Sequence, residues 1–237
     1  MNVAILTNII KETDKNWRFI FESPLYDKIN FVSGQLVQLI AQPESENPIT
    51  RNYSVSSWAD GTNKFELIIT YLEKGAMSEY LFKQAKIGDE FLYKGPMGVF
   101  ILPENLMDRD IYFVSTGSGI SPFRSMINYL YENKIPFKSI KLFFGTRTEN
   151  DLLYRQELET IQEHLPNFEY IPTLSRENKP GLAQGYVHQH YLSLIDNINE
   201  KPLIYFCGWT KMIDEGRKHL DSRGFKMKQD IRVEIFG

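Results

Sequence analysis

The sequence is poor in cysteine and histidine, the side chains that form disulfides and bind transition metals. Its one cysteine, Cys207, excludes an internal disulfide and also a cysteine-ligated iron–sulfur cluster, which needs several thiolates. Any such cluster must therefore sit on another protein. Of the four histidines, His188 and His190 have the closest spacing, but without nearby carboxylate or thiol spacing a solvated helix is expected there, and no metal.

Long apolar runs and an excess of one charge are also lacking. No apolar stretch approaches the roughly 18 residues that a membrane span requires, and residues 1–8 have no basic segment ahead of an apolar core. We therefore expect a cytoplasmic protein with no membrane partner. The formal net charge of -3 provides no broad cationic surface, so nucleic acid is not expected as a partner.

The first hundred residues carry short runs of β-branched and aromatic residues, broken by Gly, Pro, Asn or Asp. Runs of this number and spacing favour a barrel or sandwich of strands. Met77, Tyr80 and Leu81, at helical spacing, predict one helix that caps the barrel. The expected strands are 2–10, 17–22, 35–41, 51–57, 65–71 and 90–95.

After Asp110, compact apolar strands alternate with amphipathic helical stretches. This alternation predicts a parallel sheet covered by helices. A chain of 237 residues is long enough for two domains with separate cores. The polar, proline-bearing segment 102–109 is the expected linker, with domains at 1–104 and 105–237. The expected strands of the second domain are 111–115, 140–144, 168–173, 203–207 and 232–235.

The run from Arg51 to Ser57 combines a cation, an aromatic ring and several hydroxyls. In a strand, Arg51 and Tyr53 share one face while Asn52 and Ser54 share the other. A guanidinium can clamp a pyrophosphate, a phenol ring can lie on a fused heterocycle, and a serine hydroxyl can bond a ring nitrogen. FAD offers all three targets. An ordinary strand with surface side chains explains the same seven residues, so other segments must decide.

Two glycine-bearing segments precede expected helices. Thr116-Gly117-Ser118-Gly119 follows a strand, and Pro122 can open the helix after it. Backbone amides at such a helix N-terminus can bind a phosphate, although a bare strand-to-helix turn explains the spacing about as well. In the segment 75–78, the amides and the Ser78 hydroxyl could hold a pyrophosphate opposite Arg51, or Ser78 could simply cap the helix.

Taken together, these segments resemble the ferredoxin–NADP reductase family of flavoproteins. The family's flavin signature, R-x-Y-S-x-x-S, is matched at every fixed position from Arg51 to Ser57. Each further match is weak alone, but all follow the family's order along the chain. These are Gly75-Ala76-Met77-Ser78, Gly95-Pro96-Met97-Gly98, residues 116–122, Cys207-Gly208 with Met212, and Glu234-Ile235-Phe236.

The resemblance implies a two-domain α/β flavoprotein with one flavin module and no iron–sulfur domain. An N-terminal antiparallel six-stranded β-barrel would bind FAD, and a C-terminal parallel α/β, Rossmann-like domain would bind the nicotinamide nucleotide. The implied FAD contacts are Arg51, Asn52, Tyr53, Ser54, Gly75, Ala76, Met77, Ser78 and Phe236. The implied nucleotide contacts are Thr116, Gly117, Ser118, Gly119, Gly208 and Met212.

The resemblance also implies three catalytic residues. Ser54 would bond the flavin ring nitrogen, and Cys207 would lie near the nicotinamide carbon that gives up hydride, in a positioning role. Without the resemblance, Cys207 reads as a buried core residue. Glu234 would relay protons or bind the carboxamide. Phe236 would cover the isoalloxazine until the nicotinamide displaces it.

The choice of nucleotide depends on two short segments. Thr146-Arg147 and Ser175-Arg176 follow the second and third strands, where a 2′-phosphate would lie, and they favour NADP over NAD. Against this, Arg147 could pair with Asp151. In addition, Gln184 stands before Gly185, where NADP-preferring relatives often carry arginine.

We therefore expect an enzyme, a monomer, that passes electrons from NADPH through FAD to ferredoxin, flavodoxin or another iron–sulfur carrier. One alternative is the NADH-dependent reductase component of an oxygenase. A second is a flavin-bearing regulatory subunit that does not bind nicotinamide. The intact segments at Thr116 and Cys207 argue against this second alternative.

Overall fold

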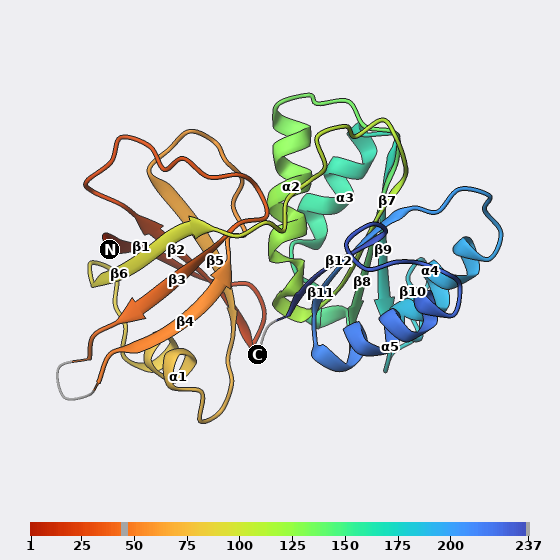
Figure 1. Cartoon of the computed structure of the whole chain (residues 1–237). Coiled ribbons are helices and arrows are strands. Elements are labelled where there is room, and N and C mark those ends of the chain that lie inside the picture. Colours follow the sequence, from red (N-terminus) through yellow and green to blue (C-terminus); the bar gives the residue numbers. More distant parts are fainter. Residues whose placement is uncertain (44–46, 236–237) are drawn as a thin grey trace.

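The computed structural model describes residues 1–43 and 47–235, and each half of the chain forms its own six-stranded sheet (Figure 1). The first sheet is antiparallel, in the order β4-β3-β6-β1-β2-β5. We call it the barrel domain, and it confirms the predicted fold of this half. Its strands are β1 (Asn2–Lys11), β2 (Asn16–Glu22), β3 (Leu36–Ala41), β4 (Ile49–Ser54), β5 (Lys64–Thr70) and β6 (Glu90–Met97).

Several predicted strand boundaries in the barrel domain were wrong, and two of them have a clear cause. The strand expected over 51–57 ends at Ser54, because the backbone then leaves β3: the Val55 amide bonds the Gln35 carbonyl and the Ser56 amide bonds the Glu66 carbonyl. The strand expected over 90–95 instead continues to Met97 as β6. The pairing with β3 is irregular there, so the additional residues are absorbed as a bulge.

Aromatic side chains fill the core of the barrel domain. Phe21 packs against Phe65 at 5.3 Å between ring centroids, and Phe65 packs against Tyr93 at 5.2 Å. The helix α1 (Ala76–Lys83) closes one end of this core through Met77 and Leu81, both about 1% exposed. The predicted capping helix is therefore present.

The second sheet is parallel, in the order β10-β9-β8-β7-β11-β12, which confirms the predicted α/β fold. We call it the nucleotide domain. Only β10 was missed, because two residues are too short to form a pattern. The strands are β7 (Ile111–Thr116), β8 (Ile140–Thr146), β9 (Phe168–Leu174), β10 (Ala183–Gln184), β11 (Leu203–Gly208) and β12 (Ile231–Ile235).

Helices cover both faces of this sheet (Figure 1). One face packs against α2 (Ser121–Glu132) and α3 (Arg155–His164), and the other packs against α4 (Val187–Ile195) and α5 (Thr210–Asp221). In the part of the chain that the structure describes, each helix is too short or too polar to cross a bilayer.

The segment between β6 and β7 is fixed on the nucleotide domain. Phe100 packs edge-on against Tyr205, with 5.2 Å between ring centroids. The Ile101 carbonyl accepts hydrogen bonds from the Tyr205 hydroxyl at 2.8 Å and from Arg232 at 2.9 Å. The expected domain boundary near Glu104 falls within this irregular segment.

Two glycines allow the loops after β7 and β11 to touch. A Cβ on Gly119 would lie 2.4 Å from the Cys207 carbonyl oxygen. Gly208 has a φ of +136°, and a Cβ there would lie 2.6 Å from the Thr116 Oγ1 atom and 2.8 Å from its carbonyl oxygen. The Trp209 amide donates to the same Thr116 hydroxyl at 3.2 Å. Both loops are therefore held together at the carboxyl ends of their strands.

We expect Gly208→Ala to destabilise the nucleotide domain by about 1–3 kcal/mol more than Gly181→Ala, because only the first adds a steric clash to an unfavourable φ. Gly181 has a φ of +82° with nothing within 4 Å of the added Cβ, which makes it the matched control. Denaturant unfolding followed by circular dichroism measures both variants. Equal losses in the two would contradict the close approach.

Candidate active site

Three side chains from distant parts of the chain lie together where the two domains face each other. Ser54 is at the end of β4, and its hydroxyl donates a hydrogen bond to a carboxylate oxygen of Glu234 on β12. Cys207 is directly opposite Glu234 in the pairing of β11 with β12. The structure thus places all three residues predicted to be catalytic in one row, with one from the barrel domain and two from the nucleotide domain.

Burial controls the protonation of this row. It raises the pKa of the Glu234 carboxyl, and the hydrogen bond from Ser54 opposes that shift only in part. Burial, together with the neighbouring Glu234 charge, raises the pKa of the Cys207 thiol well above its ordinary value. The sulfur is therefore a neutral thiol near pH 7, which suits packing against a ring better than nucleophilic attack.

Ser115 extends the row and was missed by the sequence analysis. It is directly opposite Cys207 in the pairing of β7 with β11, and it is fully buried. Its hydroxyl has no hydrogen-bond partner within residues 1–43 and 47–235. Buried hydroxyls normally have a hydrogen-bond partner. The Ser115 hydroxyl is therefore an unsatisfied polar group beside Cys207. A serine inside an apolar strand carries no sequence signal; only the strand register identifies it.

In the predicted flavin-binding segment, residues 51–57, the guanidinium of Arg51 has no acidic partner among the described residues. The exposed Arg51 guanidinium bonds only the Thr50 carbonyl, at 2.7 Å, and forms no ion pair with any described residue. Tyr53 is partly buried against the barrel core, while Asn52 is exposed and accepts a hydrogen bond from Gln38 at 3.2 Å. Because β4 is the last strand of its sheet, these side chains stand at an edge where an anion and a ring can approach.

In the segment 75–78, backbone amides are available to a ligand, whereas the side chains of Met77 and Ser78 are buried or engaged. Gly75 is the N-cap of α1, so the first amides of the helix have no partner within it. The Ser78 hydroxyl is within 2.9 Å of the Leu72 carbonyl and also accepts from the Leu72 amide at 3.1 Å. It therefore supports the preceding loop and neither caps the helix nor points freely to a ligand. Met77 is buried, which leaves Gly75 and Ala76 accessible.

The loop after β7 forms a 3-10 turn over Gly117–Ile120 that leads directly into α2. Gly117 has a φ of +56°, and its surroundings are open except for Trp209, whose indole nitrogen would be 3.9 Å from an added Cβ. Trp209 is 65% exposed and was not predicted as a site residue, although its place directly after Cys207-Gly208 marks it. Met212, which was predicted, is buried in the core beneath α5.

Two arginines stand together beyond β8 and β9. Arg147 and Arg176 are both exposed, and the Arg176 amide bonds the Arg147 carbonyl at 2.9 Å. Among the described residues neither has an ion pair. Asp151, the alternative partner of Arg147, accepts instead from the hydroxyl and amide of Thr148. Both guanidinium groups are therefore available to an anion.

The hydroxyls beside these arginines are already engaged. Thr146 donates to the Thr148 carbonyl at 3.0 Å, and Ser175 donates to the Thr146 carbonyl at 3.1 Å. They hold the two loops in place. Of the other predicted residues, Phe236 lies outside the described part of the chain. His188 is buried against Tyr191, so the solvated helix face expected there is wrong at this position.

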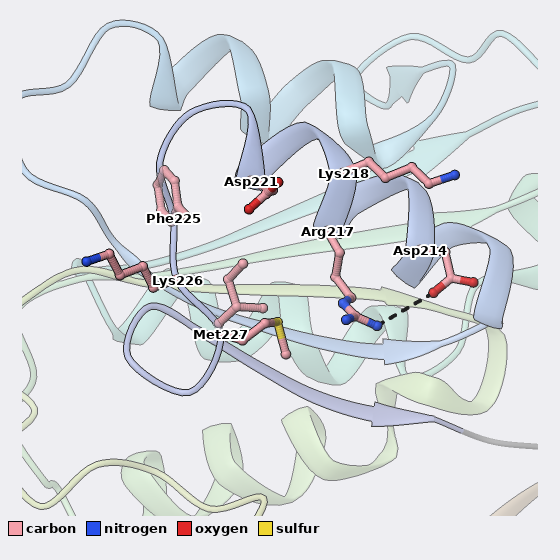
Figure 2. A pocket seen from close by; sticks show the side chains of 8 residues that line it. Asp214, Arg217, Lys218, Asp221, Phe225, Lys226 and Met227 are labelled. Carbon is pink, nitrogen blue, oxygen red and sulfur yellow. Dashed lines mark ion pairs between the residues drawn. The ribbon is translucent and has the colours of Figure 1, made fainter.

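A separate hollow of about 600 Å³ lies between α5 and the start of β12 (Figure 2). Arg217 forms an ion pair at 3.8 Å with Asp214, one turn earlier on α5, and Phe225 and Met227 supply apolar walls. No predicted site residue lines this hollow. The predicted site residues therefore lie elsewhere, and those of the row around Glu234 lie at the domain interface.

Two protein-family models match the chain in order. An oxidoreductase FAD-binding domain covers residues 4–101, and an oxidoreductase NAD-binding domain covers residues 113–218. The first range contains the whole first sheet except Asn2 and Val3 of β1. The second range contains most of the second sheet and its helices but not β12. The matches assign FAD to the first half and a nicotinamide nucleotide to the second.

Individual proteins show the same likeness. The electron transfer component of 2-halobenzoate 1,2-dioxygenase from Burkholderia cepacia is 31% identical over 91% of this chain, which spans 62% of that relative's length. A ferredoxin–NADP reductase from Neisseria gonorrhoeae, solved with bound FAD and NADP, has the same fold, with a TM-score of 0.82 and 23% identity over 98% of this chain and 97% of its own.

A further relative has nearly the same extent as this chain. Ferredoxin–NADP reductase B from Sorangium cellulosum is 32% identical over 77% of this chain and 76% of its own length. Both family models and this relative lead to one conclusion: the chain belongs to the ferredoxin–NADP reductase family of FAD- and nicotinamide-nucleotide-binding oxidoreductases.

Proposed function

We propose that this chain passes electrons from NADPH, through FAD, to a one-electron acceptor protein such as ferredoxin or flavodoxin. The observation that carries the proposal is the meeting of Ser54, from the flavin segment, with Cys207 and Glu234, from the nucleotide domain. Bound FAD supplies the conversion of a hydride into single electrons, which no side chain can perform. The chain supplies binding, orientation and proton control.

The barrel residues fit an FAD. The unpaired Arg51 guanidinium and the free amides at Gly75 and Ala76 would hold the pyrophosphate, because both favour an anion. Tyr53 would pack against the ring system, with Asn52 beside it. Met77 and Ser78 would support this segment from beneath, since both are buried. Phe236 keeps its proposed role as the aromatic that covers the flavin.

The catalytic row would divide the work between three side chains. Ser54 would turn its hydroxyl from Glu234 to the flavin ring nitrogen when FAD is bound. Glu234 would accept a hydrogen bond from the nicotinamide carboxamide or relay a proton, a role for which its raised pKa prepares it. Cys207 would pack on the nicotinamide as a neutral thiol.

The nucleotide residues would hold the coenzyme by its phosphates. Amides of Gly117, Ser118 and Gly119 and the start of α2 would receive the pyrophosphate, with Thr116 and Gly208 keeping the two loops in contact. Arg147 and Arg176 would clamp a 2′-phosphate, supported by Thr146 and Ser175. We also propose that the two domains divide near Glu104.

An alternative is the NADH-dependent reductase component of an oxygenase. The relationship to an electron transfer component of a dioxygenase favours it, as does the absence of an arginine at Gln184. The two proposals separate when NADPH and NADH are compared with ferredoxin, flavodoxin and an oxygenase-type iron–sulfur protein as acceptors. The first requires a preference for NADPH, and the alternative requires NADH.

Ser54→Ala is expected to slow flavin reduction about 100-fold while FAD stays bound, because it removes a hydrogen bond made in the transition state. Both kcat and kcat/KM should fall together. Stopped-flow reduction by NADPH measures the rate, with Ser193→Ala on α4 as a surface control. An unchanged reduction rate in Ser54→Ala would remove Ser54 from the mechanism.

The acid limb of the kcat/KM profile for NADPH is expected above pH 4.5, because the pKa of Glu234 is raised from that ordinary value. Activity should fall as the pH drops through this pKa, since protonation removes the carboxylate acceptor. In Glu234→Gln the limb should vanish and kcat/KM should drop about tenfold at neutral pH. The same acid limb in Glu234→Gln would assign it to another group.

Arg176→Ala is expected to raise the KM for NADPH at least about tenfold and to leave the KM for NADH nearly unchanged, because only NADPH carries the 2′-phosphate. Steady-state kinetics with both coenzymes measure the effect. Arg217→Ala, another arginine of the nucleotide domain, is the control and should alter neither KM. Equal effects of Arg176→Ala on both coenzymes would overturn the choice of NADP.

A further inference from the structure

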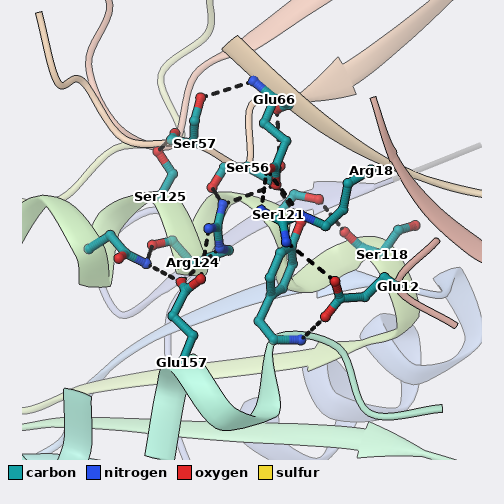
Figure 3. A network of polar contacts seen from close by, with 12 residues as sticks. Glu12, Arg18, Ser56, Ser57, Glu66, Ser118, Ser121, Arg124, Ser125 and Glu157 are labelled. Carbon is teal, nitrogen blue, oxygen red and sulfur yellow. Dashed lines mark hydrogen bonds and ion pairs between the residues drawn. The ribbon is translucent and has the colours of Figure 1, made fainter. Parts of the chain in front are cut away.

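A cluster of buried charges joins the two domains beside the candidate active site (Figure 3). Its centre is the pair of Glu66, on β5 of the barrel domain, and Arg124, on α2 of the nucleotide domain. Only 5% of Glu66 and 4% of Arg124 is exposed, and Nη1 of Arg124 lies 3.0 Å from Oε1 of Glu66. Ion pairs between domains are normally exposed and contribute little, whereas this pair is almost completely buried.

Both domains satisfy the Glu66 carboxylate. From the barrel, Arg18 donates to Oε2 at 2.6 and 3.0 Å, and the Ser56 hydroxyl donates to Oε1 at 2.9 Å. From the nucleotide domain, Oε1 accepts from Arg124 and from the Tyr154 hydroxyl at 2.8 Å. Burial alone would raise the pKa of Glu66, but the two arginines lower it below its ordinary value, so it is charged at neutral pH.

Arg124 is held equally firmly. Its Nε and Nη2 atoms donate to the two oxygens of Glu157, on α3, both at 2.8 Å, and its Nη1 also donates to the Ser56 carbonyl at 2.9 Å. Its guanidinium carbon lies 4.2 Å from the centre of the Tyr154 ring. A buried charge pair is stable only in good geometry, and removing one partner leaves the other uncompensated. All these contacts are made together in the domain orientation of this structure.

The cluster is connected to the active site on both sides. α2, which carries Arg124, begins directly after the loop that ends at Ile120. On the barrel side, Ser56 lies two residues after Ser54. Ser57 is also bound to α2, because the Ser125 hydroxyl donates to the Ser57 carbonyl at 2.6 Å. The Ser57 hydroxyl accepts from the Glu66 amide at 3.0 Å, so it is engaged within the cluster.

We propose that Glu66 and Arg124 are positioning residues: by fixing the orientation of the two domains, they set how the nicotinamide meets the flavin ring. This inference rests on the proposed function. It assigns a role to residues that touch neither cofactor. Their loss would act on the geometry of hydride transfer. It would leave the other binding residues in place, because, apart from Phe236, the residues proposed for FAD and for NADPH each belong to a single domain.

The test uses Glu66→Gln, which keeps the shape but removes the charge, and Arg124→Lys, which keeps the charge but loses the paired contacts with Glu157. The matched control is Asp230→Asn. It breaks another partly buried ion pair, with Arg109 at 3.0 Å, that lies within the nucleotide domain alone. Spin labels at Lys86→Cys and Glu163→Cys, both exposed and in different domains, report the domain orientation. Cys207 is fully buried and does not take the label.

We expect Glu66→Gln and Arg124→Lys to broaden the label distance distribution and to slow flavin reduction at saturating NADPH by about 100-fold, because small misplacements of reacting groups are costly. FAD content and the KM for NADPH should stay near those of the wild type. Asp230→Asn should lower thermal stability but change neither the distances nor the limiting rate.

An unchanged, narrow distance distribution in folded Glu66→Gln and Arg124→Lys would overturn the proposal. So would broadening in Asp230→Asn, or failure of both cluster variants to fold while Asp230→Asn folds, because the pair would then serve folding alone. If NADPH does not reduce the flavin of the wild type, the proposed function fails. The label distances still decide separately whether the pair sets the domain orientation.

Discussion

The Glu66 carboxylate is the point on which the arrangement of this molecule depends. Most apolar residues of each half pack within that half, although Ile68 of β5 joins the core of the nucleotide domain. The proposed active site cannot be made by either half, because Ser54 comes from one and Cys207 and Glu234 from the other. A charged group buried at the interface tolerates little displacement, so it holds the residues of the proposed site from both domains in one arrangement.

Much of the fold could be predicted because its signals are local. Alternating and continuous apolar runs located eleven of the twelve strands, and helical spacing located the helices. The errors arose where a distant partner overrides the local pattern. β4 ends at Ser54 because the Ser56 amide bonds Glu66 of β5 and no longer a residue of β3. β6 includes Gly95 and Pro96 because its pairing with β3 continues to Met97. Neither partner is visible in the segment itself.

The candidate site shows the same division. Arg51, Ser54 and Cys207 were predicted because a family motif marks them; the structure places Arg51 within β4, Ser54 at its end and Cys207 near the end of β11. Ser115 has no motif, and only its register opposite Cys207 reveals it. Glu66 and Arg124 are 58 residues apart, and each looks like an ordinary surface charge in the sequence. The Ser78 hydroxyl is engaged by its own loop, which spacing alone could not indicate.

The central claim is that the interface presents a flavin to a nicotinamide. The most direct measurement is the visible spectrum of the purified protein, recorded without oxygen before and after NADPH is added. The account predicts a yellow protein whose flavin absorption bleaches on addition of NADPH and returns when an oxidised acceptor is supplied. A protein that remains colourless when offered FAD, or a bound flavin that neither NADPH nor NADH bleaches, would contradict it.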